Sequence, residues 1–453
     1  MKKILLIIFA LVLSSQTIKA QVVLDANGVT IKWTGTTVPS PYFVQASPRG
    51  TMEWFVIVSD STKNNITDYA LNNPTGITYF TRPGSSTPVP FNNIVTSLLT
   101  NTDSMFFQAD SYNQPIGSWD VSNVTDMRCM FFIATSFNQP IGSWNVSKVT
   151  IMIQMFFQAD SFNQPIGSWD VSNVTNMWGL FLQATSFNQN IGSWDVGNVT
   201  NMGAMFYKAT TFNQNIDSWD VGNVTNMGGM FGVATSFNQP IGSWNVSKVT
   251  EMLVMFNQAT SFNQNIGSWN VGNVTDMRNM FYKATTFNQN IGSWNVSKVT
   301  TMLNMFNSSS LSTANYDSLL IGWSTISSAE TPLKQGVSFG AGSSKYCNGI
   351  SARDYIISNY FWTITDGGLD CSILGVEELE SSKLKIYPNP TNNIINIEGL
   401  TKNENNTIQI FDVQGKLVIT KNISEKGTID LSELNKGVYV IKIGEVAQRI
   451  VKM

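Results

Sequence analysis

The side chains in this sequence that could support chemistry recur in columns, each column being one position of a 25-residue repeat. The position after a recurrent tryptophan is Asp or Asn, and Asp170, Asp195 and Asp220 occupy it in three consecutive copies. If the copies stack like strands, about 4.8 Å apart, these like charges would attract a cation or raise a carboxyl pKa. We hypothesise a weak Ca²⁺ site there, the simpler interpretation being three solvated, screened carboxylates. No other cofactor is expected.

The position three residues after this Asp/Asn column is Lys in three copies, each of which carries Asn in that column. Charges of adjacent copies could therefore pair diagonally, Lys148 with Asp120 or Asp170. Lys248 could pair with Asp220 in the same way. A row of such polar groups is suited to many weak contacts with an extended partner. The predicted partner-binding residues are Asp120, Lys148, Lys248 and Lys298.

The composition restricts catalysis. The 453 residues include no His and three Cys, which removes His-dependent nucleophilic catalysis, the usual zinc sites with His, and a four-thiolate zinc site. A glycosidase needs two carboxyl groups with different pKa values, whereas the copies are nearly identical. We therefore expect no enzyme, with a carboxylate-dependent glycosidase as the remaining alternative. The net charge of −3 gives no electrostatic footprint for nucleic acid.

The repeat predicts the elements that position these side chains. A period of 25 lies in the range of leucine-rich-type solenoids. Trp119 and Val121 are two apart, as on one face of a strand, and the apolar residues that follow are spaced like a short helix with Thr125 as its cap. Stacked copies would bury the apolar side chains in one core. The tryptophans are Trp119, Trp144, Trp169, Trp194, Trp219, Trp244, Trp269 and Trp294.

The predicted fold class is thus an α/β solenoid of strand-plus-short-helix units over residues 101–308. Its polar columns would form a concave face of parallel strands. An Asn column that begins at Asn113 is expected to form a buried ladder. A second, partly apolar column includes Phe107, Phe132 and Phe157, and is either a partner-binding strip or a half-buried helix edge.

The segments on either side of the repeat are read from composition and short motifs. Lys2 and Lys3, an apolar run and Ala20 predict a signal peptide over 1–20, and no later run is long enough for a membrane span. We expect a β-rich N-terminal cap over 21–100, with strands at 52–58 and 77–81. A C-terminal cap over 309–373 contains Cys347 and Cys371, which are expected to form a disulfide outside the cytoplasm and leave Cys129 as a free thiol.

Residues 374–453 differ from the rest in composition. Charged residues are more frequent, and seven short alternating segments predict a small, Ig-like β-sandwich.

The repeat resembles a known family. The pattern F-N-Q-x-I-x-x-W-[DN]-V-S-N-V-T-x-M-x-x-M-F is similar to the repeats of bacterial surface proteins with BspA-like leucine-rich repeats. The closing motifs N-Y-D-S-L-L-I-G-W and F-G-A-G-S-S-K-Y-C fit the same family. The resemblance implies display at the cell surface and adhesion, and it transfers no catalytic residue.

The tail strongly resembles the type A C-terminal sorting domain of the type IX secretion system of Bacteroidetes, through Y-P-N-P, F-D-V-Q-G-K and L-N-K-G-V-Y-V-I-K-I. This resemblance implies a partner, the secretion machinery, and export to the outer-membrane surface or the medium. We therefore expect a secreted binding or adhesion scaffold for an extracellular glycan or protein, or else a structural spacer of the surface layer without a ligand. The sorting-motif residues are Tyr387, Pro388, Asn389, Pro390, Gly415, Gly437, Tyr439 and Lys452.

Overall fold

A computed structural model describes residues 21–72, 79–309, 311–325, 332–372, 385–400, 406–423, 426–443 and 446–453. The predicted signal peptide lies outside these residues. The chain forms two compact units, Met1–Leu369 and Asp370–Met453, and each is described by itself.

The first unit begins with a small β-rich region. Strands β1 (Val22–Leu24) and β2 (Ile31–Trp33) form an antiparallel pair. A second sheet has the order β3-β4-β5, formed by Phe43–Ala46, Glu53–Ser59 and Ile94–Leu98, with β3 antiparallel and β5 parallel to β4. Helix α1 (Lys63–Asn72) connects the parallel strands, and a 3₁₀ turn, η1 (Phe91–Asn93), precedes β5. The strand predicted at 52–58 is confirmed; residues 79–81 of the one predicted at 77–81 form turns, and 77–78 lie outside the described residues.

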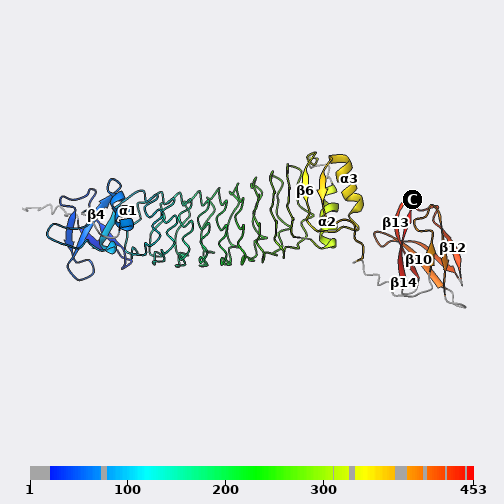
Figure 1. The fold of residues 1–453 in the computed structure, drawn as a ribbon, viewed down its shortest axis with the longest axis horizontal. Coiled ribbons are helices and arrows are strands. Elements are labelled where there is room, and N and C mark those ends of the chain that lie inside the picture. Colours follow the sequence, from blue (N-terminus) through cyan, green and yellow to red (C-terminus); the bar gives the residue numbers. More distant parts are fainter. Residues whose placement is uncertain are drawn as a thin grey trace, which may run out of the picture. The chain divides into compact units, whose positions relative to one another are not determined.

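The 25-residue copies stack one on the next between this region and two C-terminal helices (Figure 1). Single parallel bridges link the same position of successive copies, beginning with Asn101 to Asp126 and ending with Asp276 to Thr301. Met302 then bridges to Phe339, so the ladder continues into the C-terminal cap. We call the side of the stack that carries these bridges the bridged face, and the opposite positions around the tryptophans the tryptophan side.

The predicted strand and helix of each copy are both wrong. Described residues 102–300 contain turns and single bridges, without any helix or longer strand. The reason lies in the backbone hydrogen bonds. The N–H groups of Met127, Cys129, Phe131 and Ile133 donate to carbonyls of the next copy, 2.7–3.0 Å away. Alternate N–H groups close turns within the copy, whereas a helix would satisfy its N–H groups internally and leave few to link the copies.

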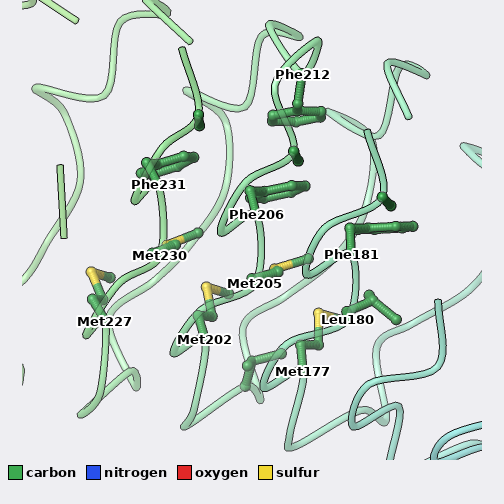
Figure 2. Close-up of a cluster of buried hydrophobic side chains, with 14 of the residues drawn as sticks. Met177, Leu180, Phe181, Met202, Met205, Phe206, Phe212, Met227, Met230 and Phe231 are labelled. Atoms are coloured by element: carbon green, nitrogen blue, oxygen red, sulfur yellow. The ribbon is translucent and has the colours of Figure 1, made fainter. Parts of the chain in front are cut away.

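The apolar side chains predicted for the core are confirmed as buried. The eight tryptophans of the repeat are only 1–4% exposed. Figure 2 shows the methionine and phenylalanine rows, with the rings of Phe181, Phe206 and Phe231 lying parallel in three successive copies. Each of these side chains has the equivalent side chains of its neighbours above and below it. One copy could not cover such side chains alone, so burial and stacking depend on each other.

Glycine precedes the Ser-Trp pair because successive copies approach closely there. A Cβ on Gly142 would lie 2.5 Å from the carbonyl oxygen of Pro165 in the next copy. The equivalent glycines at 117, 167 and 192 meet the next copy at 2.5–2.7 Å. Seven of the eight copies keep this glycine and Asp217 replaces it in one, so the close approach favours glycine without requiring it in every copy.

Equivalent rings are not equally spaced on the two sides of the stack. Ring centroids of Phe107, Phe132 and Phe157 on the bridged face are 4.6 and 4.4 Å apart. Those of Trp144 and Trp169 are 6.4 Å apart, and later tryptophan pairs keep 6.4–6.5 Å. If each copy were only shifted along the stack, all equivalent atoms of successive copies would be the same distance apart. Unequal distances on the two sides mean that each copy is also rotated relative to the one before it. The rotation axis therefore lies nearer the bridged face.

The first unit ends in a cap of two helices and two short strands, α2 (Thr313–Ser324), β6 (Ser338–Gly340), α3 (Ile350–Tyr360) and β7 (Thr363–Thr365). Strands β6 and β7 pair in parallel. The buried carboxylate of Asp317 in α2 accepts the backbone N–H groups of Cys347, Asn348 and Gly349 at 2.8–2.9 Å. These N–H groups precede α3, so one side chain ties the two helices together.

The second unit contains seven strands among its described residues, one for each predicted segment. Three form the sheet β12-β9-β8, from Gly427–Asp430, Ile394–Glu398 and Lys385–Tyr387. Four form the sheet β11-β10-β13-β14, from Leu417–Ile423, Asn406–Asp412, Gly437–Ile443 and Val446–Lys452. An isoleucine-rich core includes residues of both sheets, such as Ile395 and Ile441.

Candidate functional site

The predicted calcium residues do not form a metal site. Each carboxylate turns back on its own chain, with Oδ1 of Asp170, Asp195 and Asp220 accepting a backbone N–H two residues later at 2.9–3.1 Å. The hydroxyl hydrogen bond from Ser172, followed by its backbone N–H, lowers the pKa of Asp170, opposite to the predicted rise. Across the described residues no three His, Cys, Asp or Glu side chains are grouped closely enough to hold a metal ion. The calcium hypothesis therefore has no geometric support.

The predicted diagonal charge pairs are replaced by contacts along one column. The ammonium group of Lys148 donates to Oδ1 of Asn123, at the same position of the preceding copy, over 2.8 Å. Lys248 and Lys298 make the equivalent contacts at 2.7 and 2.6 Å. Asp120 is only 5% exposed and accepts from Ser122, so it is not available to a partner as predicted. The lysines are exposed but already engaged within the stack.

The other polar columns also bond to the neighbouring copy. In the Asn column, Oδ1 of Asn188 accepts the backbone N–H of Asn213 and the side-chain amide of Gln214, both at 3.0 Å. This is the predicted ladder, although its members are half-buried or exposed rather than buried. The Thr125 hydroxyl donates to the carbonyl of Thr100, 25 residues earlier, so it caps no helix. Every later threonine of that column repeats the contact at 3.0–3.3 Å.

The buried indole groups complete this pattern. Trp194 donates its N–H to the carbonyl of Ile166 at 3.1 Å, and the other tryptophans do the same at 2.9–3.2 Å. The concave polar face predicted around the tryptophans is therefore wrong in two respects. The bridges lie at the opposite positions, and most polar groups near the tryptophans serve the stack itself.

The bridged face differs because its outward columns change from copy to copy. The column of Arg128 continues with Ile153, Trp178, Gly203, Gly228, Leu253, Arg278 and Leu303. The column of Phe132 continues with Phe157, Leu182, Tyr207, Gly232, Asn257, Tyr282 and Asn307. We call the apolar members of these columns, together with Phe107, the apolar strip. A column that tolerates Trp, Gly and Arg is not specified by stacking.

Within the apolar strip, aromatic side chains are partly exposed. Phe107 and Trp178 are 37% and 36% exposed. A Cβ on Gly203 would lie 2.9 Å from the Trp178 ring, and one on Gly232 would lie 2.6 Å from Tyr207. These rings therefore lie against the bare backbone of the next copy. The strip is the half-exposed apolar surface that the sequence predicted, without the predicted helix.

Two ion pairs lie on the bridged face, each within one copy. Arg128 and Asp126 form an ion pair at 2.7 Å, and Arg278 and Asp276 form one at 2.6 Å. The hydrogen bond that each guanidinium group donates to its carboxylate partner raises the guanidinium pKa. Copies between these pairs carry Ile, Trp, Gly and Leu in the same column, and Glu251 in the bridge column accepts a hydrogen bond from the Asn226 amide at 3.0 Å.

A shallow hollow of about 390 Å³ lies on another part of the stack, lined by Asn265, Gly267, Ser268, Gln289, Asn290 and Ser293. Its polar side chains are again engaged. Ser268 and Ser293 donate to backbone carbonyls at 2.9 and 2.6 Å, and Asn265 and Asn290 accept backbone N–H groups.

The cysteines divide as predicted between free and bonded forms. Cys129 is a half-buried free thiol whose pKa is raised mainly by burial, which makes it a poor nucleophile. Cys347 and Cys371, for which the sequence predicts a mutual disulfide, are each disulfide-bonded.

The sorting-motif residues of the tail gather around its last strand. The side-chain amide of Asn389 bonds to β14 through both of its polar atoms. Its Oδ1 accepts the Val451 N–H at 2.8 Å, and its Nδ2 donates to the Arg449 carbonyl at 2.7 Å. The buried ammonium group of Lys452 donates to the carbonyls of Leu431, Ser432 and Leu434.

The remaining motif residues shape turns and strand ends of the tail. Gly415 has a φ of +79° in the turn between β10 and β11. Gly437 and Tyr439 lie in β13, where the Tyr439 hydroxyl donates to the Asn435 carbonyl at 2.8 Å. The Tyr387 hydroxyl donates to Glu398 at 2.6 Å, and Pro388 and Pro390 flank Asn389 in the chain. Of the motif residues, Asn389 and Lys452 thus tie the C-terminal strand to the rest of the tail.

These features define a repeat protein that ends in a separately folded β tail. Comparison with family models identifies the tail, residues 385–453, as a secretion system C-terminal sorting domain. The repeats match the family described as "Mycoplasma protein of unknown function, DUF285" three times, at 79–177, 140–232 and 212–319. Because these matches together span 79–319, more than half of the chain, the protein belongs to this family.

The comparisons with curated proteins and with solved structures gave no match. The sorting domain implies export through the type IX secretion system, contact with its machinery, and a secreted or cell-surface location. None of the helices in the described residues is long and apolar enough to cross a membrane.

Proposed function

We propose that the repeats form a solenoid that acts, after export, as a binding or adhesion scaffold for an extracellular glycan or protein. The BspA-like resemblance of the repeat points to the same role. The contact surface in this proposal is the apolar strip of the bridged face, in place of the Asp and Lys columns expected from the sequence. No catalytic step is part of the proposal.

One observation carries this choice of surface. Many polar side chains on the other columns are bonded within the stack, as Lys148 is to Asn123. The apolar strip instead exposes parts of Phe107 and Trp178, on columns whose residues stacking does not specify. Partly exposed aromatic side chains in a contiguous row are typical of surfaces that bind partners.

The test is a binding screen with the purified protein on a glycan array, together with attachment of whole cells that display it. We expect the double variant Trp178→Ala, Tyr207→Ala to lose at least about tenfold in apparent affinity. Phe361→Ala is the matched control, because Phe361 is 65% exposed but lies at the end of α3, outside the strip. Equal binding by both variants would contradict the assignment to the strip.

The second candidate is a structural spacer without a ligand. The continuous ladders of the Asn, Thr and Trp columns favour it, because they stiffen a stack whether or not anything binds. Absence of any ligand in the screen, with normal cell attachment by a strain lacking the protein, would support the spacer. Hydrolysis of a polysaccharide that Asp195→Asn abolishes would instead point to the glycosidase alternative.

A further inference from the structure

A second hollow lies where the bridged face continues into the C-terminal cap. It has a volume of about 210 Å³ and is lined by Leu303, Asn304, Asn307, Ser338, Phe339, Gly340, Thr363 and Thr365. Leu303 and Asn307 are the last members of the two variable columns, and β6 and β7 supply the other side. Because Met302 bridges to Phe339, the hollow continues the same backbone ladder that carries the apolar strip.

Gly340 lets the last copy of the repeat approach β6 closely at this hollow. A Cβ there would lie 2.7 Å from the backbone nitrogen of Asn304 and 2.8 Å from Oδ1 of Asn307. In the parallel pairing of β6 with β7, Ser338 is opposite Thr363 and Gly340 is opposite Thr365. The two threonines are therefore on one face of β7, beside a strand position without a side chain.

Three hydroxyl groups of this hollow are exposed and uncommitted. Among the described residues, the hydroxyls of Ser338, Thr363 and Thr365 have no hydrogen-bond partner, whereas the threonine hydroxyls of the stacked column bond to the preceding copy. Asn307 donates to Oδ1 of Asn304 at 2.8 Å, which orients both amides. The larger hollow near Ser268 has no comparable set of free hydroxyls.

The chemistry of the lining selects a class of ligand. None of the eight lining residues is charged, so an ionic ligand would find no counter-charge among them. Hydroxyl and amide groups each offer both donors and acceptors, which matches a ring that carries several hydroxyls. Leu303 is 49% exposed and supplies an apolar surface for the C–H face of such a ring. The volume is below the usual range for drug-sized ligands, which fits a single ring.

We propose that this hollow binds one neutral sugar unit, such as the terminal residue of a polysaccharide that lies along the bridged face. The proposal rests on the binding role proposed above and deepens it by naming a neutral glycan as the ligand class. Thr363 and Thr365 hydrogen-bond the sugar hydroxyls, and Leu303 packs against the ring.

The test is a ligand-observed NMR titration of the full chain with glucose, galactose, mannose and N-acetylglucosamine, and with glucuronate as the charged comparison. We expect saturable millimolar binding of at least one neutral sugar and none of glucuronate. The double variant Thr363→Val, Thr365→Val should weaken that binding about tenfold, because it removes two hydroxyls and keeps the side-chain shape. Thr407→Val, at an exposed site in β10, is the matched control and should bind like the parent.

Two results would overturn the proposal: no binding of any neutral sugar, or equal binding by the parent and the double valine variant. Binding of glucuronate as strong as that of the neutral sugars would also contradict it. The outcomes separate this inference from the scaffold role. If only Trp178→Ala, Tyr207→Ala reduces attachment, the scaffold stands and the sugar hollow does not. If a neutral sugar binds but the strip variant attaches normally, the sugar hollow stands and the assignment of the scaffold role to the strip does not.

Discussion

The tryptophan side and the bridged face of the same stack follow opposite rules. Near the tryptophans, positions keep their residue type or exchange a few polar types, such as Asp and Asn or Asn and Lys, and most side chains bond within the stack, as the Trp194 indole does to the Ile166 carbonyl. On the bridged face the backbone makes the link between copies, through N–H groups such as that of Met127. Side chains there are free to vary, and the column of Trp178 also contains glycine and arginine.

This contrast teaches where a repeat protein can evolve a specific surface. A position whose side chain completes a ladder cannot change in one copy without leaving a partner unsatisfied in the next. A position whose backbone already makes the link carries no such constraint. Variation among the copies of one chain therefore marks the surface available for recognition, independently of any relative.

The largest test of the contrast compares two tryptophans. Trp194→Ala removes a buried ring and leaves the Ile166 carbonyl without its donor, so we expect a loss of about 3–5 kcal/mol in unfolding free energy. Trp178→Ala removes a ring that is 36% exposed and has no indole hydrogen bond among the described residues of the stack, so the loss should be smaller, about 1–2 kcal/mol. Urea unfolding followed by circular dichroism measures both. Similar losses would erase the distinction between the two sides.

The next test removes one member of the Asn ladder. Asn188→Ala deprives the Asn213 N–H and the Gln214 amide of their common acceptor, and we expect a loss of about 1–2 kcal/mol. The control is Asn257→Ala in a variable column, whose amide accepts only from the adjacent Gln258. The control should be close to neutral in the same unfolding assay. A neutral Asn188→Ala would mean that water replaces the ladder without cost.

A smaller effect, of opposite sign, is expected at the first copy. Tyr112 occupies the position that is Phe in the later copies, and its buried hydroxyl has no hydrogen-bond partner among the described residues. Burial also raises its pKa well above the usual value. Tyr112→Phe should therefore raise the unfolding free energy by up to about 1 kcal/mol, which is measured as a higher thermal midpoint. The reverse change, Phe162→Tyr, should lower it, and a loss in both variants would reveal an unseen partner for Tyr112.

The smallest effect concerns pH. The hydrogen bonds from Ser172 lower the pKa of Asp170 in the folded state below its ordinary value. Their contribution is therefore present above the unfolded pKa and is lost as the pH falls through the lower folded value. Asp170→Asn, which copies the natural Asn145 unit, should be slightly less stable at pH 7 and equal to the parent in strong acid. Parallel stability curves from neutral pH to about pH 2 would contradict the shift.

The sequence was sufficient to predict what is buried but not how the backbone runs. Tryptophan and methionine at a fixed period must be shielded by neighbours, and the short alternating segments of the tail predicted its strands. The helix was predicted because the spacing from Val124 to Ala134 is that of a helical stripe, and successive three-residue turns give the same spacing. The turns place Cys129 and Ile133 at positive φ, which neither residue type signals.

The predicted charge pairs between adjacent copies are absent for a related reason. Their opposite charges predicted that Lys148 would pair with Asp170. Instead, Asn123 occupies the same position in the preceding copy, and its Oδ1 accepts from Lys148 at 2.8 Å. Contacts along a column depend on the registration of copies, which the pattern within one copy does not contain. The apolar strip was visible as a column, but its exposure required the structure.

The unequal ring spacing has a consequence for how such a chain can change. Every copy turns by a fixed increment as well as advancing by a fixed step, because the rings are 4.4–4.6 Å apart on one side and 6.4–6.5 Å on the other. An in-frame duplication of one copy would thus change both the length of the stack and the orientation of its last copy. Recombination between nearly identical coding segments would therefore change length and orientation together, because an added copy makes the same contacts with its neighbours as the existing copies do.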